Sequence, residues 1–420
     1  MTSEERRVAR RVRREAKRNE KKEKLAEEYD DINQVANAKH LLYSAKQSRK
    51  GVRFKASVQK YFINILHNIF RAKRDILNGK DVRMGFIEFV LSERGKTRNI
   101  RAMKFSERVI QCCLCTFVLV PYLLISCVFD NGASQKYKGI HFALKRCEEH
   151  INGYYKRYGQ DGYVLSIDFS GYFDNIEHEH IFEIIEEKFK DQKLKLLIIR
   201  FIEAFGKKSL GIGSQVSQIF AVLYVSEIDH YIREVLHIGL SARYMDDSYL
   251  MHPDKEYLQN TVLPILVEKY AELGITVNMK KTKIVSTKDF KFLKVRFLRL
   301  DSGKILKLPD SKAFVRERRK MKKFAEKLKS GEMTIEDIRT SYQSFYGYYQ
   351  HLDCKKRLHE MDVLYYRLYG EKPEHKKKKK PKTFKIEKMS ARKKKAIKWG
   401  NDLREKEKQI IDNQKERESA

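Results

Sequence analysis

Apolar and polar positions follow two different periods along this chain. Over residues 52–78 the apolar positions recur about three or four residues apart, which predicts amphipathic helix, and residues 83–91 then have the composition of a strand. Over residues 163–297, strand-like runs such as YVLSID and RYMDDSYLM alternate with helical runs such as YLQNTVLPILVEKYAEL. This alternation predicts an α+β fold built around a small sheet.

Composition divides the rest of the chain. Its first fifty residues are dominated by Arg, Lys and Glu, which predicts a solvated helix that either lies on phosphates or simply faces water. Near the other end, a helical stretch places Tyr and Phe between Lys and Arg, and the last fifty residues form a basic tail with almost no apolar core. We expect five parts, at residues 1–50, 51–160, 161–300, 301–370 and 371–420.

One apolar segment, residues 109–129, approaches the length of a membrane-spanning helix. Gln111, Thr116 and Pro121 interrupt it, so the sequence favours a buried helix that Pro121 breaks, and no membrane association.

Charge points to a polyanionic partner. The chain carries 89 Lys and Arg against 56 Asp and Glu, a formal net charge of +33, on a protein with 42% hydrophobic residues. A basic field on a folded body attracts phosphate backbones, so nucleic acid is the predicted partner. Charge alone leaves open a ribosome-associated or merely soluble basic protein.

The cysteines give no metal or disulfide pattern. Cys112, Cys113 and Cys115 crowd into the apolar segment, and no His or second CxxC stands at the spacing of a zinc site. They are interpreted as buried thiols without disulfides. Because the N-terminus lacks an apolar signal segment, we expect the cytoplasm.

Three carboxylates carry the candidate chemistry. Asp246 and Asp247 stand between two strand-like runs, which predicts a tight hairpin, and Asp168 ends the apolar run VLSID. Two adjacent carboxylates repel each other unless a cation is present, and a trio of this kind suits two-metal phosphoryl transfer. We therefore predict two Mg²⁺ ions, with Mn²⁺ as the alternative, held by these three residues. A plain surface turn is the competing interpretation of the Asp pair.

Over residues 52–370 the chain resembles bacterial reverse transcriptases. Residues 168–176 (DFSGYFDNI) and residues 244–247 (YMDD) are similar to the two catalytic blocks of that family. The resemblance implies a right-hand polymerase. The second part of the chain would then be the fingers with the start of the palm, the third an antiparallel, RRM-like palm sheet, and the fourth a helical thumb.

The same resemblance implies nucleotide contacts. Lys96 and Arg98 fall in the fingers block whose cations hold the incoming triphosphate, and Phe173 falls where an aromatic ring excludes a ribose 2′-hydroxyl. Lys281 matches a lysine near the leaving pyrophosphate, where it could act as a general acid, with Lys280 as the rival. For each of these residues an ordinary surface or packing role is the alternative.

Residues 212–218 (IGSQVSQ) depart from the family's usual Gln-Gly-x-x-x-Ser-Pro block, since Ile212 replaces Gln and Gln218 replaces Pro. This form resembles reverse transcriptases of diversity-generating retroelements and some of their relatives, in which it is associated with lowered fidelity. Gln218 is therefore a predicted nucleotide contact.

Other blocks follow the same order. Residues 108–111 resemble the helix after the triphosphate block, residues 132–141 the block that supports template and palm, and residues 290–294 the primer grip. The zinc-bearing endonuclease cluster of many group II intron proteins is missing from the sequence, and the characteristic retron blocks are incomplete.

The sequence therefore predicts an RNA-directed DNA polymerase that uses an RNA template, a DNA primer or product and dNTPs, in a bacterial retroelement or an antiphage defence system. A dedicated non-coding RNA or accessory protein would fit either setting. The alternatives are a template-independent or protein-primed polymerase on the same fold, and a non-catalytic RNA-binding protein.

Overall fold

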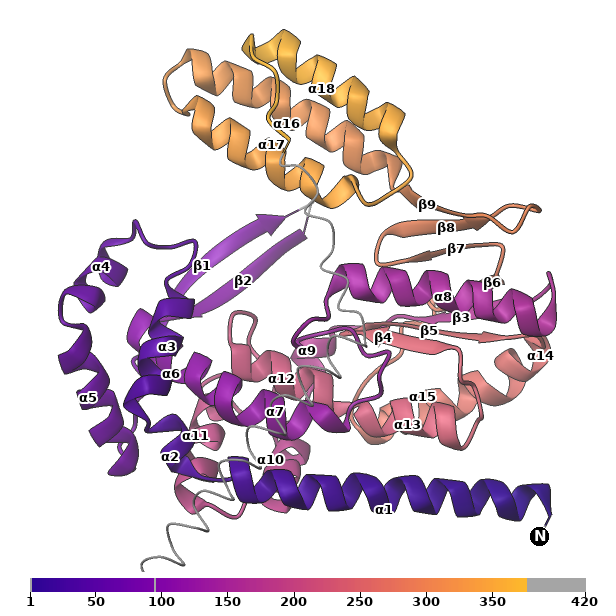
Figure 1. Cartoon of the computed structure of the whole chain (residues 1–420), viewed down its shortest axis with the longest axis horizontal. Helices are drawn as coiled ribbons and strands as arrows, with labels where there is room; N and C mark the ends of the chain where they lie inside the picture. The colour runs from indigo at the N-terminus through magenta and orange to yellow at the C-terminus, as the bar shows by residue number, and fades with distance from the viewer. Residues whose placement is uncertain (1, 94–95, 376–420) are drawn as a thin grey trace, which may run out of the picture. The chain divides into compact units, whose positions relative to one another are not determined.

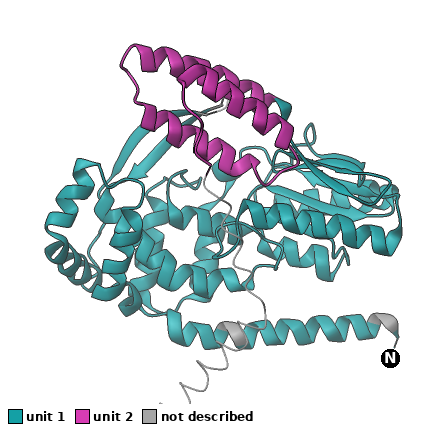
Figure 2. Cartoon of the chain, turned by 45° about the horizontal axis from the view of Figure 1, so that its top comes forward, with its two compact units in different colours: residues 1–311 teal, residues 312–420 magenta. Residues whose placement is uncertain are grey.

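The computed structural model describes residues 2–93 and 96–375. Contacts divide the chain into two compact units, residues 1–311 and residues 312–420 (Figure 2). Each unit buries its own set of apolar side chains.

A four-stranded antiparallel sheet, the central sheet, forms the middle of the first unit (Figure 1). Its strands, in the spatial order β4-β5-β3-β6, are β3 (Tyr163–Ile167), β4 (Ser241–Tyr244), β5 (Asp247–His252) and β6 (Lys283–Ser286). Val164 and Leu165 of β3 are fully buried, as expected of an apolar strand that pairs on both edges. The predicted α+β class and antiparallel sheet are confirmed.

Helices surround this sheet. They are α8 (Ile140–Tyr158), α9 (Tyr172–Asn175), α10 (His178–Lys188), α11 (Gln192–Glu203), α12 (Gln215–Tyr224), α13 (Ser226–Glu234), α14 (Lys255–Tyr257), the π-helical η3 (Leu258–Val262) and α15 (Leu263–Glu272). Both α8 and α13 contact β4, which holds this strand from two elements far apart in the sequence.

The N-terminal part of the unit is helical as predicted. It contains α1 (Ser3–Tyr29), α2 (Ile32–Val35), α3 (Ala38–Ser48), α4 (Ala56–Ile63) and α5 (Ile65–Leu77). Helix α1 begins with a capping box, in which Thr2 and Glu5 satisfy each other's backbone N–H groups.

A two-stranded antiparallel ribbon, β1 (Phe86–Glu93) and β2 (Lys96–Met103), follows α5. The strand predicted for residues 83–91 therefore starts three residues before the observed strand, which begins at Phe86. Arg83 lies outside the ribbon because its guanidinium binds the Asp81 carboxylate and the carbonyl of Arg200, at 3.1 Å.

The apolar segment is a buried helix, but it does not end at Pro121. It runs through α6 (Phe105–Leu114), a π-helical turn η1 (Cys115–Leu119), α7 (Val120–Leu123) and a 3-10 turn η2 (Leu124–Ser126). The π turn lets Val120 donate to Cys115 five residues earlier, and Pro121, which has no N–H to donate, falls in the first turn of α7. Phe105–Ser126 is long and apolar enough to cross a membrane, yet 61% of its most apolar window is buried in the protein.

A three-stranded antiparallel sheet closes the first unit, formed by β7 (Asp289–Phe292), β8 (Val295–Arg299) and β9 (Ile305–Pro309). The second unit contains α16 (Ser311–Lys329), α17 (Ile335–Tyr349) and α18 (Lys355–Tyr369), whose core includes Phe314, Tyr342 and Tyr365. Helical structure is thus confirmed over residues 311–370. The basic tail predicted for residues 371–420 lies almost wholly outside the described residues.

Candidate active site

The β4–β5 hairpin presents the two adjacent carboxylates. Tyr244 pairs with Asp247, so Met245 and Asp246 form the two-residue turn, and Met245 adopts the left-handed conformation with φ 57°. Asp246 and Asp247 are both exposed at this turn. The hairpin predicted from the sequence is confirmed.

Strand register brings Asp168 to the same edge of the central sheet. Ile167, the last residue of β3, pairs with Ser248 of the neighbouring antiparallel strand β5. The next residue on β3 therefore lies level with the preceding residue on β5, which places Asp168 across from Asp247. Carboxylates 78 or 79 residues apart in the sequence meet at one point because these strands are neighbours.

The segment after α15 fixes the backbone of Asp168. The Asn278 N–H donates to the Asp168 carbonyl at 2.8 Å, and the Asp168 N–H donates to the Thr282 hydroxyl at 3.3 Å. This segment also brings in Lys281, whose Nζ lies 3.2 Å from Oδ2 of Asp168. The structure thus places Lys281, and not Lys280, against a candidate metal ligand.

The donor chemistry of this edge fits Mg²⁺, which prefers carboxylate oxygens and retained waters. In residues 2–93 and 96–375, no three His, Cys, Asp or Glu side chains lie together as a group that could hold a metal ion. The Lys281 ammonium instead provides the positive charge beside Asp168, whose side chain is about one-third exposed.

A buried ion pair, which the sequence did not reveal, lies beneath the hairpin. The guanidinium of Arg243 on β4 binds both carboxylate oxygens of Asp229 on α13, with its closest contact at 2.7 Å. It also donates to the carbonyls of Val222, at 2.8 Å, and Met245, at 3.2 Å. Burial would lower the pKa of Arg243, but the Asp229 carboxylate holds that pKa above its ordinary value. The backbone at Met245, just before Asp246, is therefore hydrogen-bonded to a buried guanidinium that stays charged.

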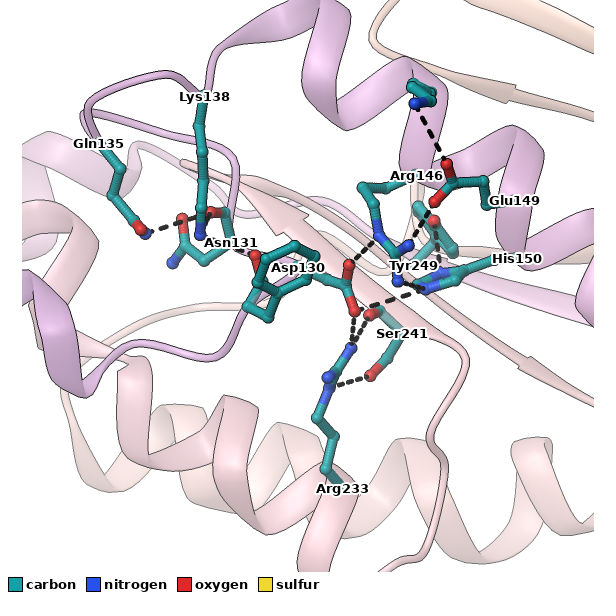
Figure 3. A network of polar contacts seen from close by, with 12 residues as sticks. Asp130, Asn131, Gln135, Lys138, Arg146, Glu149, His150, Arg233, Ser241 and Tyr249 are labelled. Atoms are coloured by element: carbon teal, nitrogen blue, oxygen red, sulfur yellow. Dashed lines mark hydrogen bonds and ion pairs between the residues drawn. The ribbon is translucent and has the colours of Figure 1, made fainter. Parts of the chain in front are cut away.

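A second polar network, also missed from the sequence, supports the other side of β4 (Figure 3). Asp130 is 3% exposed and accepts hydrogen bonds from Arg146 of α8 and Arg233 of α13, with His150 at 3.4 Å. His150 also bonds the Tyr249 hydroxyl on β5 at 2.9 Å. Burial would raise the pKa of Asp130, but hydrogen bonds from His150, Arg146 and Arg233 hold it well below its ordinary value. One carboxylate thereby joins α8 and α13 beside the central sheet.

The loop after Asp130 contains a glycine, Gly132, that is closely packed against its neighbours. A Cβ on Gly132 would lie 3.3 Å from the Tyr244 ring, and the Gly132 N–H donates to the Arg243 carbonyl at 3.1 Å. This supports the predicted role of residues 132–134 next to the palm strand. Lys138 of the same loop donates to two backbone carbonyls of that loop, at 2.7 and 3.1 Å.

Residues 212–218 join the β1–β2 ribbon to α12. Gly213 has φ +121°, and a Cβ there would lie 2.9 Å from the backbone oxygen of Arg101 on β2. Ser214 caps α12 and donates to the Gln111 side chain at 3.1 Å, while Gln218 is exposed on the first turns of that helix. Residues 212–218 thus contact both strand β2 and the block at residues 108–111.

The remaining nucleotide-contact candidates occupy β2 and α9. Arg98 is exposed on β2; Lys96 begins that strand, but its side chain lies outside the described residues. Phe173 lies on α9, half-buried, with its ring 5.8 Å from that of Tyr172. Phe173 therefore follows β3 on a helical turn and does not sit at the strand end.

The predicted primer-grip hairpin is also present. Phe292 of β7 pairs with Val295 of β8, and the two turn residues, Leu293 and Lys294, both have positive φ. The Phe292 ring meets the ring of Tyr249 on β5 edge-on at 4.8 Å, which attaches this hairpin to the central sheet.

Comparisons with known proteins identify the domain. Residues 93–297 match the family model described as reverse transcriptase (RNA-dependent DNA polymerase), a span that includes all three carboxylates. Over these residues the chain is similar to reverse transcriptases, in agreement with the predicted right-hand class and RNA-directed DNA polymerase assignment.

Solved structures with similarity to the chain include two of telomerase. Apo telomerase from Candida tropicalis truncated from its C-terminal domain is 14% identical, with a TM-score of 0.41 over 53% of this chain and 54% of that one. Apo telomerase from Candida tropicalis is 14% identical, with a TM-score of 0.42 over 54% and 49%. The chain thus matches about half the length of each. No curated protein sequence matched.

Proposed function

We propose that this protein is a template-dependent DNA polymerase that copies RNA by two-metal nucleotidyl transfer. The observation that carries the proposal is the register of β3 against β5, which sets Asp168 level with the turn that presents Asp246 and Asp247. Exposed carboxylates at one sheet edge, next to a lysine, meet the requirements of nucleotidyl transfer better than those of a structural turn.

In this proposal Asp168, Asp246 and Asp247 would hold two Mg²⁺ ions. When bound, the ions lower the pKa of the primer 3′-hydroxyl and stabilise the charge on the pyrophosphate leaving group. Lys281, whose Nζ lies 3.2 Å from Asp168, would donate a proton to the departing pyrophosphate.

Other residues of the chain would orient the nucleotide. Lys96 and Arg98 on β2 supply cations for the triphosphate, and Phe173 forms the wall below the ribose. Gln218 is exposed on α12, which contacts β2 through the preceding Gly213, so it can reach the same nucleotide.

We further propose a cytoplasmic enzyme of a bacterial retroelement or an antiphage defence system. The Ile-Gly-x-x-x-Ser-Gln block supports a relation to diversity-generating retroelements and error-prone copying. A dedicated non-coding RNA or an accessory protein is the proposed additional partner. Template-independent or protein-primed synthesis would use the same carboxylates, so the main test includes reactions without template.

The test replaces Asp246 and Asp247 together by Asn and measures dNTP incorporation on an RNA template with a DNA primer. Since several kcal/mol of transition-state stabilisation is lost, incorporation should fall by at least about 10³-fold while primer-template affinity is retained. Asp301→Asn, in the exposed β8–β9 turn, is the matched control and should retain activity. Retained synthesis by the double variant would contradict the metal assignment, and equal synthesis without template would favour the template-independent alternative.

A further inference from the structure

Helix α1 presents four cations on one exposed stripe. Arg6, Arg10, Arg13 and Lys17 are all exposed, and at about 100° per residue they fall within about 60° of one another around the helix. With a rise of 1.5 Å per residue the stripe is about 16 Å long. Neither Arg10 nor Arg13 forms an ion pair with a side chain that the structure describes. We call these four residues the α1 stripe.

The opposite face of the helix is turned toward the protein. Arg11, Glu15, Arg18 and Asn19 line a cavity of about 570 Å³ between α1 and the helices α10 and α13. By the same helical geometry, the centre of this face lies about 155° from the α1 stripe. The stripe therefore faces away from the body of the unit.

A specific ion pair fixes that orientation. Arg18 donates to both carboxylate oxygens of Glu234 on α13, at 2.5 and 3.2 Å, and the Glu234 side chain is only 10% exposed. At its C-terminal end, α1 packs Leu25, Ala26 and Tyr29 against the core of the unit. The stripe is thus displayed on a helix held at two points, unlike a freely solvated charged segment.

The chemistry of the stripe selects its ligand. Within residues 6–18 the one acidic residue is Glu15, which lines the cavity. Glu20, one turn beyond Lys17, pairs with Lys24, so the outer face is predominantly basic. The single aromatic residue of α1 is Tyr29, which packs on the core, so the stripe offers no platform on which single-stranded bases could stack. Cations without aromatics bind a phosphate backbone. A straight stripe of about 16 Å spans about five steps of a B-form duplex at 3.4 Å each, and somewhat more steps of an A-form RNA duplex, whose rise is shorter.

We infer that the α1 stripe is a second nucleic-acid contact that binds the phosphate backbone of double-stranded RNA, apart from the catalytic edge. Helices α13 and α15 run between α1 and the central sheet, so the stripe and the catalytic edge lie on different elements of the unit (Figure 1). The choice of RNA over DNA rests on the proposed function, in which a folded RNA supplies the template. The stripe would hold a duplex part of that RNA outside the copied region.

The test neutralises the stripe in the full-length protein with Arg6→Gln, Arg10→Gln, Arg13→Gln and Lys17→Gln, since Gln retains helix propensity. Binding to a blunt synthetic RNA duplex of about 20 base pairs is measured across a salt series. Affinity should fall at least about tenfold near 0.15 M salt, and the slope of log K against log salt should decrease by about 2–4, because each lost phosphate contact removes up to about 0.9. Replacing the three arginines by Lys, which keeps the charges, should retain binding.

A matched control removes four exposed lysines from other elements by Gln substitution, at Lys190, Lys207, Lys255 and Lys304. This variant should bind the RNA duplex within about threefold of the wild type. Circular dichroism and thermal unfolding establish that each variant is folded. A folded stripe variant with unchanged duplex affinity and salt slope overturns the inference, and so does an equal loss in the control.

Two further arms separate the alternatives. Vesicles with 30% phosphatidylserine test a membrane surface, and stripe-dependent vesicle binding with unchanged RNA duplex binding would overturn the inference. A DNA duplex of the same length should bind more weakly than RNA, and a preference for DNA would overturn the assignment to RNA. Primer extension on a short template is measured separately, so its absence defeats the proposed function while the duplex assay still decides the role of the stripe.

Discussion

Replacing Asp229 by Asn would remove the negative half of the buried ion pair beneath the hairpin. Arg243 is 1% exposed and Asp229 7% exposed, so neither group can recover its hydration when its partner is lost. Asn has nearly the shape of Asp, but it is uncharged and its amide group turns donors toward the guanidinium. The substitution therefore leaves an uncompensated buried cation next to the catalytic turn.

Breaking a buried pair in this way costs about 3–5 kcal/mol. For a unit of this length the unfolding entropy is about 0.65 kcal/mol/K, at about 2.1 cal/mol/K per residue, so the melting temperature should fall by roughly 5–8 °C. Because Arg243 also donates to the Met245 carbonyl, DNA synthesis should decrease below the unfolding temperature as well.

The chain offers a matched control in a second Asp–Arg pair with two hydrogen bonds. Asp289 and Arg296 lie 2.5 Å apart on β7 and β8, and both side chains are more than 40% exposed. An exposed pair contributes only about 0–1 kcal/mol, so Asp289→Asn should lower the melting temperature by less than about 2 °C. Differential scanning calorimetry and primer extension on both variants test the argument. Equal shifts for the two variants would refute the importance of burial here.

Two further predictions concern the Asp130 network and Phe173. Because the folded-state pKa of Asp130 is below its ordinary value, its stabilisation should be fully present above about pH 4 and disappear as the pH falls toward the folded-state pKa. The melting-temperature difference between wild type and Asp130→Asn should therefore be constant from pH 7 to 5 and shrink below pH 4; a difference unchanged at pH 3 would exclude this carboxylate as the cause. Phe173→Ala should raise rNTP use relative to dNTP in a competition on one primer-template, since space opens for the 2′-hydroxyl. An unchanged ratio would leave Phe173 with a packing role.

Local sequence patterns were sufficient for the strand end and the hairpin that present the carboxylates. Asp168 ends an apolar run, and Asp246 and Asp247 lie between two strand-like runs, so both positions follow from residues within one element. The buried Arg243 gave no such signal, because an Arg in a short strand is normally exposed and its partner lies 14 residues earlier on a helix. The Asp130 network was missed for the same reason, since its members come from four separate segments.

Local rules were also insufficient where neighbouring structure decided the outcome. A proline inside a helical segment usually ends the helix. At Pro121 a π turn precedes the proline, and the helical segment continues into the core as far as Ser126. The strand predicted from the composition of residues 83–91 is present as β1. The observed strand begins only at Phe86, because Arg83 binds groups outside the ribbon, one of them 117 residues away.

The buried charges next to β4 also bear on how the catalytic turn is kept in register. A slip of β4 by one residue would turn Arg243 to the opposite face of the sheet, away from Asp229, and would displace Asp246 and Asp247 from Asp168. Such a slip leaves a buried charge unpaired, whereas an apolar residue at this position would tolerate it. The double replacement Arg243→Met with Asp229→Leu should therefore recover most of the stability lost in Asp229→Asn, but not DNA synthesis. Full recovery of synthesis would show that packing alone sets the register.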